Sequence, residues 1–189
     1  MSNETNSRSG GVKKQGLRIP GSRHDYPAIT AAILHRYTLD PNGIHGVEHW
    51  ARVLLNALTL AESTGADPEV VALFALFHDS CRINDNRDYH HGRRGAELAL
   101  SLRGTLVHLD DARFSLLWDA CCYHTDGLTD GETAVQVCWD ADRLDLGRVG
   151  ITPQPDRLCT EVARLLLPQA HTRSTGNCIP GEIFGFLWL

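Results

Sequence analysis

The sequence predicts an all-α, single-domain helical bundle, and three observations support this fold class. From residue 26 onward, apolar residues recur at helical spacing, and no convincing alternating pattern of a strand intervenes. The run 70–77 is apolar on every side, which is typical of a helix at the centre of a domain. The chain has 189 residues, of which 42% are hydrophobic and 22% are charged. That composition supports one sizeable core and excludes wholesale disorder.

Turn and capping signals separate the first predicted helices, which we expect at about 27–37, 47–63 and 68–77. The segment 40–43, Asp-Pro-Asn-Gly, predicts a turn, because Asn and Gly tolerate positive φ. Gly65 follows the end of the second helix. Asp67-Pro68-Glu69 then offers a capping carboxylate, a proline at the first helical position and an acid in the first turn, which predicts a helix start.

Further helices are expected at about 91–103, 111–124, 132–146 and 155–167. We therefore divide the chain into a flexible basic tail (1–24), a helical domain (25–167) and an apolar C-terminal extension (168–189). The extension ends in EIFGFLWL. This ending favours packing on its own domain; the alternative is a contact that forms a homo-oligomer.

Charge and cysteine usage narrow the class of protein. The net charge is −5, so nothing global attracts a nucleic-acid backbone or an anionic membrane. We expect no membrane span and no secretory signal, because no long apolar run is present. Six cysteines without a C-x-x-C pair indicate reduced thiols and a cytoplasmic protein.

The chain has ten histidines, and the positions of several of them predict a metal site. The apolar run 70–77 ends in His78-Asp79, and burying this pair is costly unless a partner such as a divalent cation satisfies both groups. If the pair stood alone, the alternative to a metal site would be a histidine that caps the end of the helix and an aspartate that is exposed to solvent. Four other helices, however, also offer an imidazole or a carboxylate on an inner face. These residues are His49, His91, His124 and Asp142.

This pattern resembles the HD superfamily of metal-dependent phosphohydrolases, whose signature is His … His-Asp … Asp. The matching segments are HGVEHWARV with His49, LFALFHDS with His78-Asp79, and WDADRLDLG with Asp142. The order and the helical context agree over residues 45–146. The resemblance implies a helical domain of the HD type that places His49, His78, Asp79 and Asp142 around one metal ion.

Two more segments are similar to HD phosphodiesterases that hold two metals. HGRRGA, which begins at His91, matches their H-x-x-x-G-A segment, and Tyr123-His124 precedes a glycine-containing loop as theirs does. The GYP signature of one such group is absent, so cyclic dinucleotide hydrolysis is not implied. The resemblance assigns His91 and His124 to a second metal, with Asp79 as the bridge. Imidazoles and carboxylates without thiolates suit one or two ions of Mn, Fe, Co, Ni or Mg.

A phosphorylated substrate needs cationic partners, and both lysines lie in the tail, at 13 and 14. We therefore expect arginines to bind phosphate: Arg82 first, then Arg94 and Arg143, with Arg93 as a further candidate. Surface ion pairs are the alternative for each of them. Asp79 and Arg82 are the candidate catalytic residues. His45 and Asp145 are expected to contact and orient the ligands of the metal.

Three functions fit this pattern. The leading hypothesis is a cytoplasmic hydrolase that uses metal-activated hydroxide to cleave a small phosphomonoester or phosphodiester, with nucleotides among the candidate substrates. The same ligands suit a di-iron oxygenase of the HD type. A module of this fold that senses a nucleotide without catalysis is the third.

Overall fold

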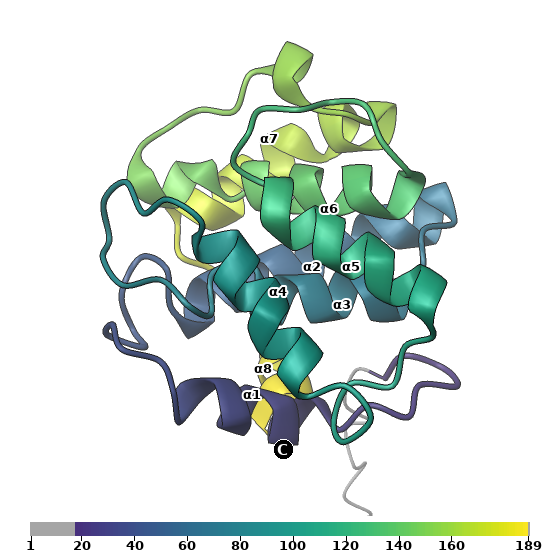
Figure 1. Cartoon of the computed structure of the whole chain (residues 1–189). Helices are drawn as coiled ribbons and strands as arrows, with labels where there is room; N and C mark the ends of the chain where they lie inside the picture. The colour runs from purple at the N-terminus through teal and green to yellow at the C-terminus, as the bar shows by residue number, and fades with distance from the viewer. Residues whose placement is uncertain (1–17, 189) are drawn as a thin grey trace, which may run out of the picture.

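A computed structural model describes residues 18–188, with the side chains of Phe184 and Trp188 excepted (Figure 1). In this range the chain forms only helices, apart from one isolated bridge between Arg103 and Val107, which confirms the predicted all-α fold. The α-helices are α1 (Tyr26–Leu34), α2 (Val47–Thr64), α3 (Pro68–Phe77), α4 (His91–Ser101), α5 (Asp111–Tyr123), α6 (Thr133–Arg143), α7 (Glu161–Thr175) and α8 (Gly181–Trp188). Two short 3₁₀ helices, η1 (Leu146–Val149) and η2 (Pro155–Arg157), join α6 to α7.

Helix α3 lies at the centre of the bundle, with α2, α5 and α6 packed against it (Figure 1). Every residue from Val70 to Phe77 is buried, as expected for a helix that has no polar face. Its neighbours supply large buried side chains, among them Trp50 of α2 and Leu117 of α5. This enclosure fixes the position of the two polar residues that follow α3.

The capping signals act as the sequence predicts. Asp67 accepts hydrogen bonds from the backbone N–H groups of Glu69 and Val70 at 2.9 and 3.2 Å, and so begins α3. Gly65 ends α2 with a left-handed φ of 75°.

The helix expected at 155–167 is wrong in its bounds. The chain forms η2, extends through Leu158, and begins α7 only at Glu161. The reason is Asp140 on α6, whose carboxylate accepts the backbone N–H groups of Cys159 and Thr160 at 2.7 and 2.8 Å. Helix α7 then runs through Pro168, so the domain boundary expected at 167/168 falls inside a helix.

The sequence predicts a flexible tail at one end of the domain and a separate extension at the other, but in the structure both ends of the described chain pack on the domain. Ile19 is buried, and His24 is hydrogen-bonded to Glu69 at 2.8 Å, so residues 18–24 belong to the domain. Residues 1–17 of the predicted tail lie outside the described range. Helix α8 packs beside α1 at one end of the molecule (Figure 1), with the rings of Phe186 and Tyr26 4.3 Å apart. No helix within residues 18–188 has the length and apolar character needed to cross a membrane.

Helix α4 approaches the end of α3 very closely at Gly95. A Cβ atom there would lie 2.0 Å from the backbone oxygen of Phe77, which is rigid. This contact explains the glycine in the H-x-x-x-G-A segment, because only a residue without a side chain fits.

We expect Gly95→Ala to lower the free energy of unfolding by about 1–3 kcal/mol, because the added methyl group overpacks the core. Urea denaturation measures the change. Gly131→Ala is the matched control, since its nearest neighbours would be 3.7 Å away on Trp139. Equal stabilities of the two variants would contradict this account of the α3–α4 contact.

Candidate metal centre

Helices α2, α3 and α6 bring the first group of ligand atoms together. His49 of α2 and His78, directly after α3, turn their Nε2 atoms toward each other at 3.0 Å. Asp142 of α6 places Oδ1 3.4 Å from His49 Nε2 and 3.8 Å from His78 Nε2. Asp79 completes the group with Oδ2 3.6 Å from His49 Nε2.

A second group lies on the other side of Asp79. His91 begins α4 and His124 follows α5, and their Nε2 atoms are 2.9 Å apart. The second oxygen of Asp79, Oδ1, is 3.0 Å from His91 Nε2 and 3.7 Å from His124 Nε2. One carboxylate thus presents one oxygen to each group, which is the bridging arrangement that the resemblance implies.

The hydrogen bonds of the four imidazoles decide which nitrogen carries the proton. The Nδ1 atoms of His78, His91 and His124 each donate to a backbone carbonyl, of Phe74, Asp88 and Cys121 respectively, at 3.1, 2.6 and 2.7 Å. His49 Nδ1 donates to Asp145 Oδ2 at 2.7 Å. Each neutral ring therefore has an unprotonated Nε2 that faces the cluster. Two such lone pairs at about 3 Å repel each other unless a cation or a proton lies between them.

The electrostatics of the first group favour a cation over a proton. Burial lowers the pKa of His49, and it lowers that of His78 to about 4, so both rings are neutral at pH 7. Burial alone would raise the pKa of Asp79, but His78 and its other imidazole neighbours outweigh this and hold it well below its usual range. Neutral imidazoles beside an ionised carboxylate form a ligand set that suits a divalent cation.

The second group is less favourable for a cation. Burial lowers the pKa of His124, but hydrogen bonding and attraction from Asp79 outweigh it, so the net shift is upward. A proton therefore competes more strongly here. In addition, Arg82 Nη1 donates to His91 Nε2 at 3.1 Å, and its positive charge opposes a cation at this position. We expect the second group to bind its ion more weakly than the first.

Comparison with known proteins agrees with this geometry. The model of the HD domain family matches residues 46–147, which contain all six ligand residues. The chain belongs to the HD domain family. This family is metal-dependent, and both clusters of the structure suit a metal.

A solved structure described as a predicted HD superfamily hydrolase from an uncultured Thermotogales bacterium has a similar fold. The two share 24% sequence identity at a TM-score of 0.62, over 79% of this chain and 86% of that one. A search of curated proteins finds no match.

Behind His49, the HD domain holds a buried chain of hydrogen bonds that begins at Asp145. The other oxygen of Asp145, Oδ1, accepts from Arg52 Nε at 2.7 Å, and all three side chains are almost completely buried. Arg52 also donates to Asn177, in the loop after α7. Sequence reasoning predicted Asp145 in this position but missed Arg52, although it lies one turn from His49 on the same face of α2. Asn177 gave no local signal, because it comes from 125 residues away.

His45 and Arg82 both contact Asp79; a contact with a metal ligand was expected for His45 but not for Arg82. His45 Nδ1 donates to Asp79 Oδ2 at 2.7 Å, and Arg82 Nη1 lies 3.4 Å from Asp79 Oδ1. Of the two consecutive histidines His90 and His91, His90 is exposed and His91 is buried.

Arg148 on η1, which sequence reasoning missed, lines a hollow of about 410 Å³ above the cluster together with Arg82. The hollow is also lined by His124, Asp142 and Val149.

Arg94 and Arg143, expected to bind substrate, have other contacts in the structure. Arg94 forms a double hydrogen bond with the carboxylate of Asp88 at 2.8 and 2.7 Å, which is the ion pair considered as the alternative. Arg143 donates to the carbonyl of Arg157 at 2.9 Å and to that of Leu128, and it does not line the hollow above the cluster. Both arginines stabilise loops. The further candidate, Arg93, is exposed and pairs with Glu97.

Elemental analysis of purified variants tests the two groups of ligands. We expect His78→Ala to lose the more tightly bound ion, His124→Ala only the weaker one, and Asp79→Asn to lose both, because its carboxylate is shared. His35→Ala, at an exposed histidine, is the control. Identical metal content in the His78 and His124 variants would contradict two separable sites.

Asp145→Asn tests the buried chain behind His49. We expect the affinity for the first ion to fall roughly 10- to 100-fold, because His49 loses the anionic acceptor that orients it. Competition with a fluorescent chelator measures this affinity. Asp140→Asn is the matched control, since Asp140 is equally buried but binds only the loop before α7. Asp140→Asn should lower the free energy of unfolding and leave the metal affinity unchanged. A loss of metal affinity in Asp140→Asn, but not in Asp145→Asn, would refute the role of Asp145.

Proposed function

We propose that this protein is a metal-dependent phosphohydrolase that cleaves a phosphomonoester or a phosphodiester, with nucleotides among the candidate substrates. It uses one or two divalent ions of Mn, Fe, Co, Ni or Mg. The observation that carries this proposal is the carboxylate of Asp79, which two groups of imidazoles share at the floor of a hollow lined by two arginines. Membership of the HD domain family and the similar fold of a predicted HD superfamily hydrolase support it.

The two arginines suit a phosphoryl group. Arg82 lies beside the second ligand group, 3.1 Å from His91 Nε2. Arg148 is associated with the first group through Asp145, since its Nη1 is 3.8 Å from Asp145 Oδ2. A planar guanidinium on either side of the cluster can donate hydrogen bonds to phosphate oxygens in a fixed geometry. We propose that Arg148 takes the part in substrate binding that sequence reasoning gave to Arg143.

The remaining groups of the site have definable tasks. A bound divalent cation supplies positive charge that lowers the pKa of water and neutralises a phosphoryl oxygen. His45 donates to Asp79 and keeps its Oδ2 lone pairs directed at the first group. Asp145 holds His49 in the tautomer that leaves Nε2 free.

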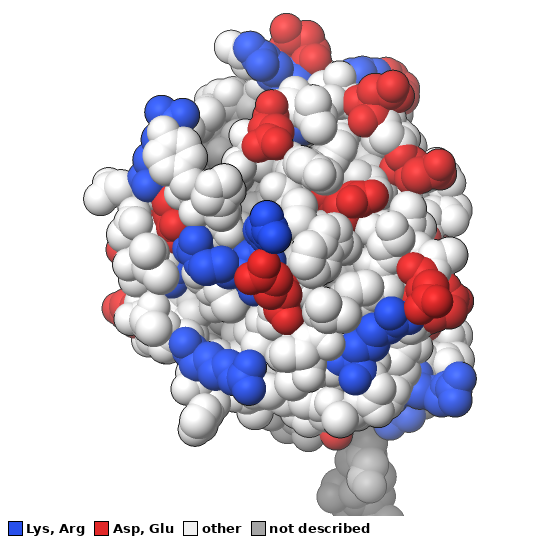
Figure 2. All heavy atoms as spheres, in the orientation of Figure 1, with Lys and Arg blue, Asp and Glu red and all other residues white. Residues whose placement is uncertain are grey.

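A small substrate fits the surface better than a nucleic-acid backbone does. On the face drawn in Figure 2, basic and acidic side chains are interspersed, whereas a phosphate backbone is bound by a continuous basic surface. We also propose a cytoplasmic location, which the six free cysteines support. Self-association through the C-terminal segment stays a prediction.

Hydrolysis of a panel of esters, with each of the five metals, tests the proposed function: release of phosphate is measured for the phosphomonoesters, and release of the alcohol for the phosphodiesters. We expect activity that EDTA abolishes and added metal restores. Arg148→Gln should lower kcat/KM roughly ten- to hundredfold, because a charged hydrogen bond to the substrate is lost. Arg36→Gln, at an exposed arginine after α1, is the control.

The outcomes separate the alternatives. No hydrolysis of any phosphomonoester or phosphodiester with any metal would overturn the hydrolase. Tight nucleotide binding without turnover would then indicate a sensing module. Mixed-valent iron with oxygen consumption would indicate a di-iron oxygenase instead.

A further inference from the structure

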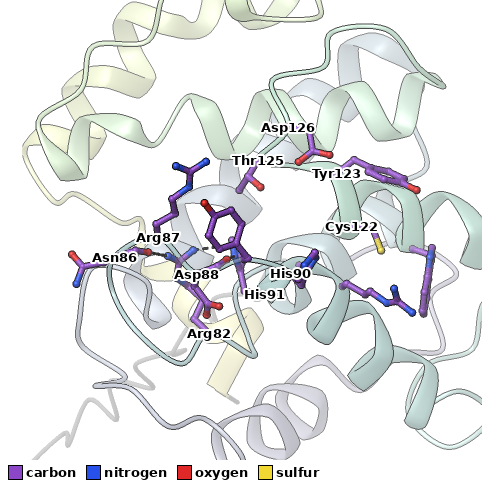
Figure 3. Close-up of a pocket in the computed structure, with 14 residues that line it drawn as sticks. Arg82, Asn86, Arg87, Asp88, His90, His91, Cys122, Tyr123, Thr125 and Asp126 are labelled. Atoms are coloured by element: carbon purple, nitrogen blue, oxygen red, sulfur yellow. Dashed lines mark hydrogen bonds between the residues drawn. The ribbon is translucent and has the colours of Figure 1, made fainter.

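A second, larger hollow of about 730 Å³ lies beside the metal centre (Figure 3). It is lined by the loop before α4, the start of α4, the end of α5 and the segment that follows α5. Arg82, Asn86 and Thr125 line both this hollow and the one above the cluster, so the two lie next to each other. In Figure 3, Arg87 and Asp88 lie on one side, and Tyr123 and Asp126 on the other. A substrate whose phosphate lies at the cluster can therefore extend into this space.

Aromatic side chains distinguish the lining of this hollow. Tyr89, Trp118 and Tyr123 line it. Tyr89 is 64% exposed and Tyr123 is 46% exposed, whereas Tyr26 is buried and Tyr37 is partly buried. Both exposed tyrosines of the chain thus face the same cavity, from two different elements. Flat, accessible rings around a cavity are the feature by which proteins stack planar ligands.

Arg94 of α4 holds the loop that carries Tyr89 in place. Arg94 binds the carbonyl of Tyr89 at 2.9 Å, the carbonyl of Cys81 at 3.0 Å and both carboxylate oxygens of Asp88. The following residue, His90, adopts a left-handed φ of 64°, which this network stabilises. The backbone of Tyr89 is therefore held at the hollow without a ligand, so binding a ring costs less ordering of this loop.

Cationic groups accompany the rings. The guanidinium of Arg87 lies 4.8 Å from the centre of the Tyr89 ring, and Arg93 also lines the hollow. Arg87 covers one face of the Tyr89 ring, as guanidinium groups do on aromatic rings, so a ligand ring would stack on the other face. These residues make the hollow partly charged, whereas an alkyl chain would prefer purely apolar surroundings.

We propose that this hollow binds a flat aromatic ring in the organic part of the substrate, stacked against Tyr89 and Tyr123, while the phosphate lies at the metal centre. The inference rests on the proposed function, and it narrows the substrate to phosphate esters that carry such a ring. Short alkyl or sugar phosphates leave the hollow empty and bind through the phosphate alone.

Two probes that differ only in the ring test this proposal. Adenosine 5′-monophosphate and ribose 5-phosphate share the same phosphorylated primary alcohol, so their leaving groups are chemically alike. Equilibrium dialysis of the full chain with Ca²⁺, an ion outside the five proposed for catalysis, measures binding with a cation present and without turnover; the other three common nucleoside 5′-monophosphates extend the series. The kcat/KM of each ester with Mn²⁺ is measured separately.

We expect at least one nucleoside monophosphate to bind roughly tenfold or more tightly than ribose 5-phosphate, which is the effect of stacking one base. Tyr89→Leu and Tyr123→Leu should each reduce this ratio severalfold and leave ribose 5-phosphate unchanged. Tyr89→Phe and Tyr123→Phe keep the rings and should retain the ratio. Leu165→Ala, at an exposed residue of α7, is the matched surface control.

Equal affinities for ribose 5-phosphate and all four nucleotides would overturn the ring site, even if both kinds of ester are hydrolysed. A ratio that survives both leucine substitutions would overturn it as well. Failure of the proposed function has a different signature, because no ester of either class would then be hydrolysed in the turnover assays. The binding series would still decide whether the hollow holds a ring.

Discussion

The metal centre depends on one constraint, which is that each of four imidazoles has its Nδ1 proton committed to a fixed acceptor. For three of them the acceptor is a backbone carbonyl three or four residues earlier in the same helix or turn. Helical geometry therefore sets the ring orientation as soon as the local backbone forms. His49 is the exception, because it relies on Asp145, 96 residues away, and its orientation depends on the packing of α2 against the end of α6. The four Nε2 lone pairs consequently meet only in the folded domain.

Sequence reasoning predicted the elements whose signals are local. The buried run of α3, its capping Asp67, and the inward positions of His49, His91 and His124 follow from periodicity and capping, and the structure places them as expected. The ligand pairing through Asp79 came from the resemblance to HD proteins and not from spacing. The bounds of α7 failed because Asp140 acts on the loop before it from another helix.

The arginines show why long-range contacts could not be read from the sequence. Arg94 and Arg143 lie close in sequence to ligand residues, yet Asp88 and two loop carbonyls engage them. Arg52 and Arg148, which both contact Asp145 behind His49, are recognisable only once the fold brings Asp145 next to them. Proximity along a helix places a side chain on a face, but the partner that it finds there is a tertiary property.

The charges around the site also favour an anionic ligand once a cation is bound. The site contains three carboxylates and three guanidinium groups, so with neutral imidazoles its net charge is close to zero. The carboxylates are those of Asp79, Asp142 and Asp145, and the guanidinium groups those of Arg52, Arg82 and Arg148. One divalent cation therefore makes it positive by about two charges, in a largely buried environment where that charge is poorly screened. A phosphate dianion compensates this excess, whereas a neutral ester does not. Metal and phosphate affinities must then be linked, since each stabilises the charge state that the other requires.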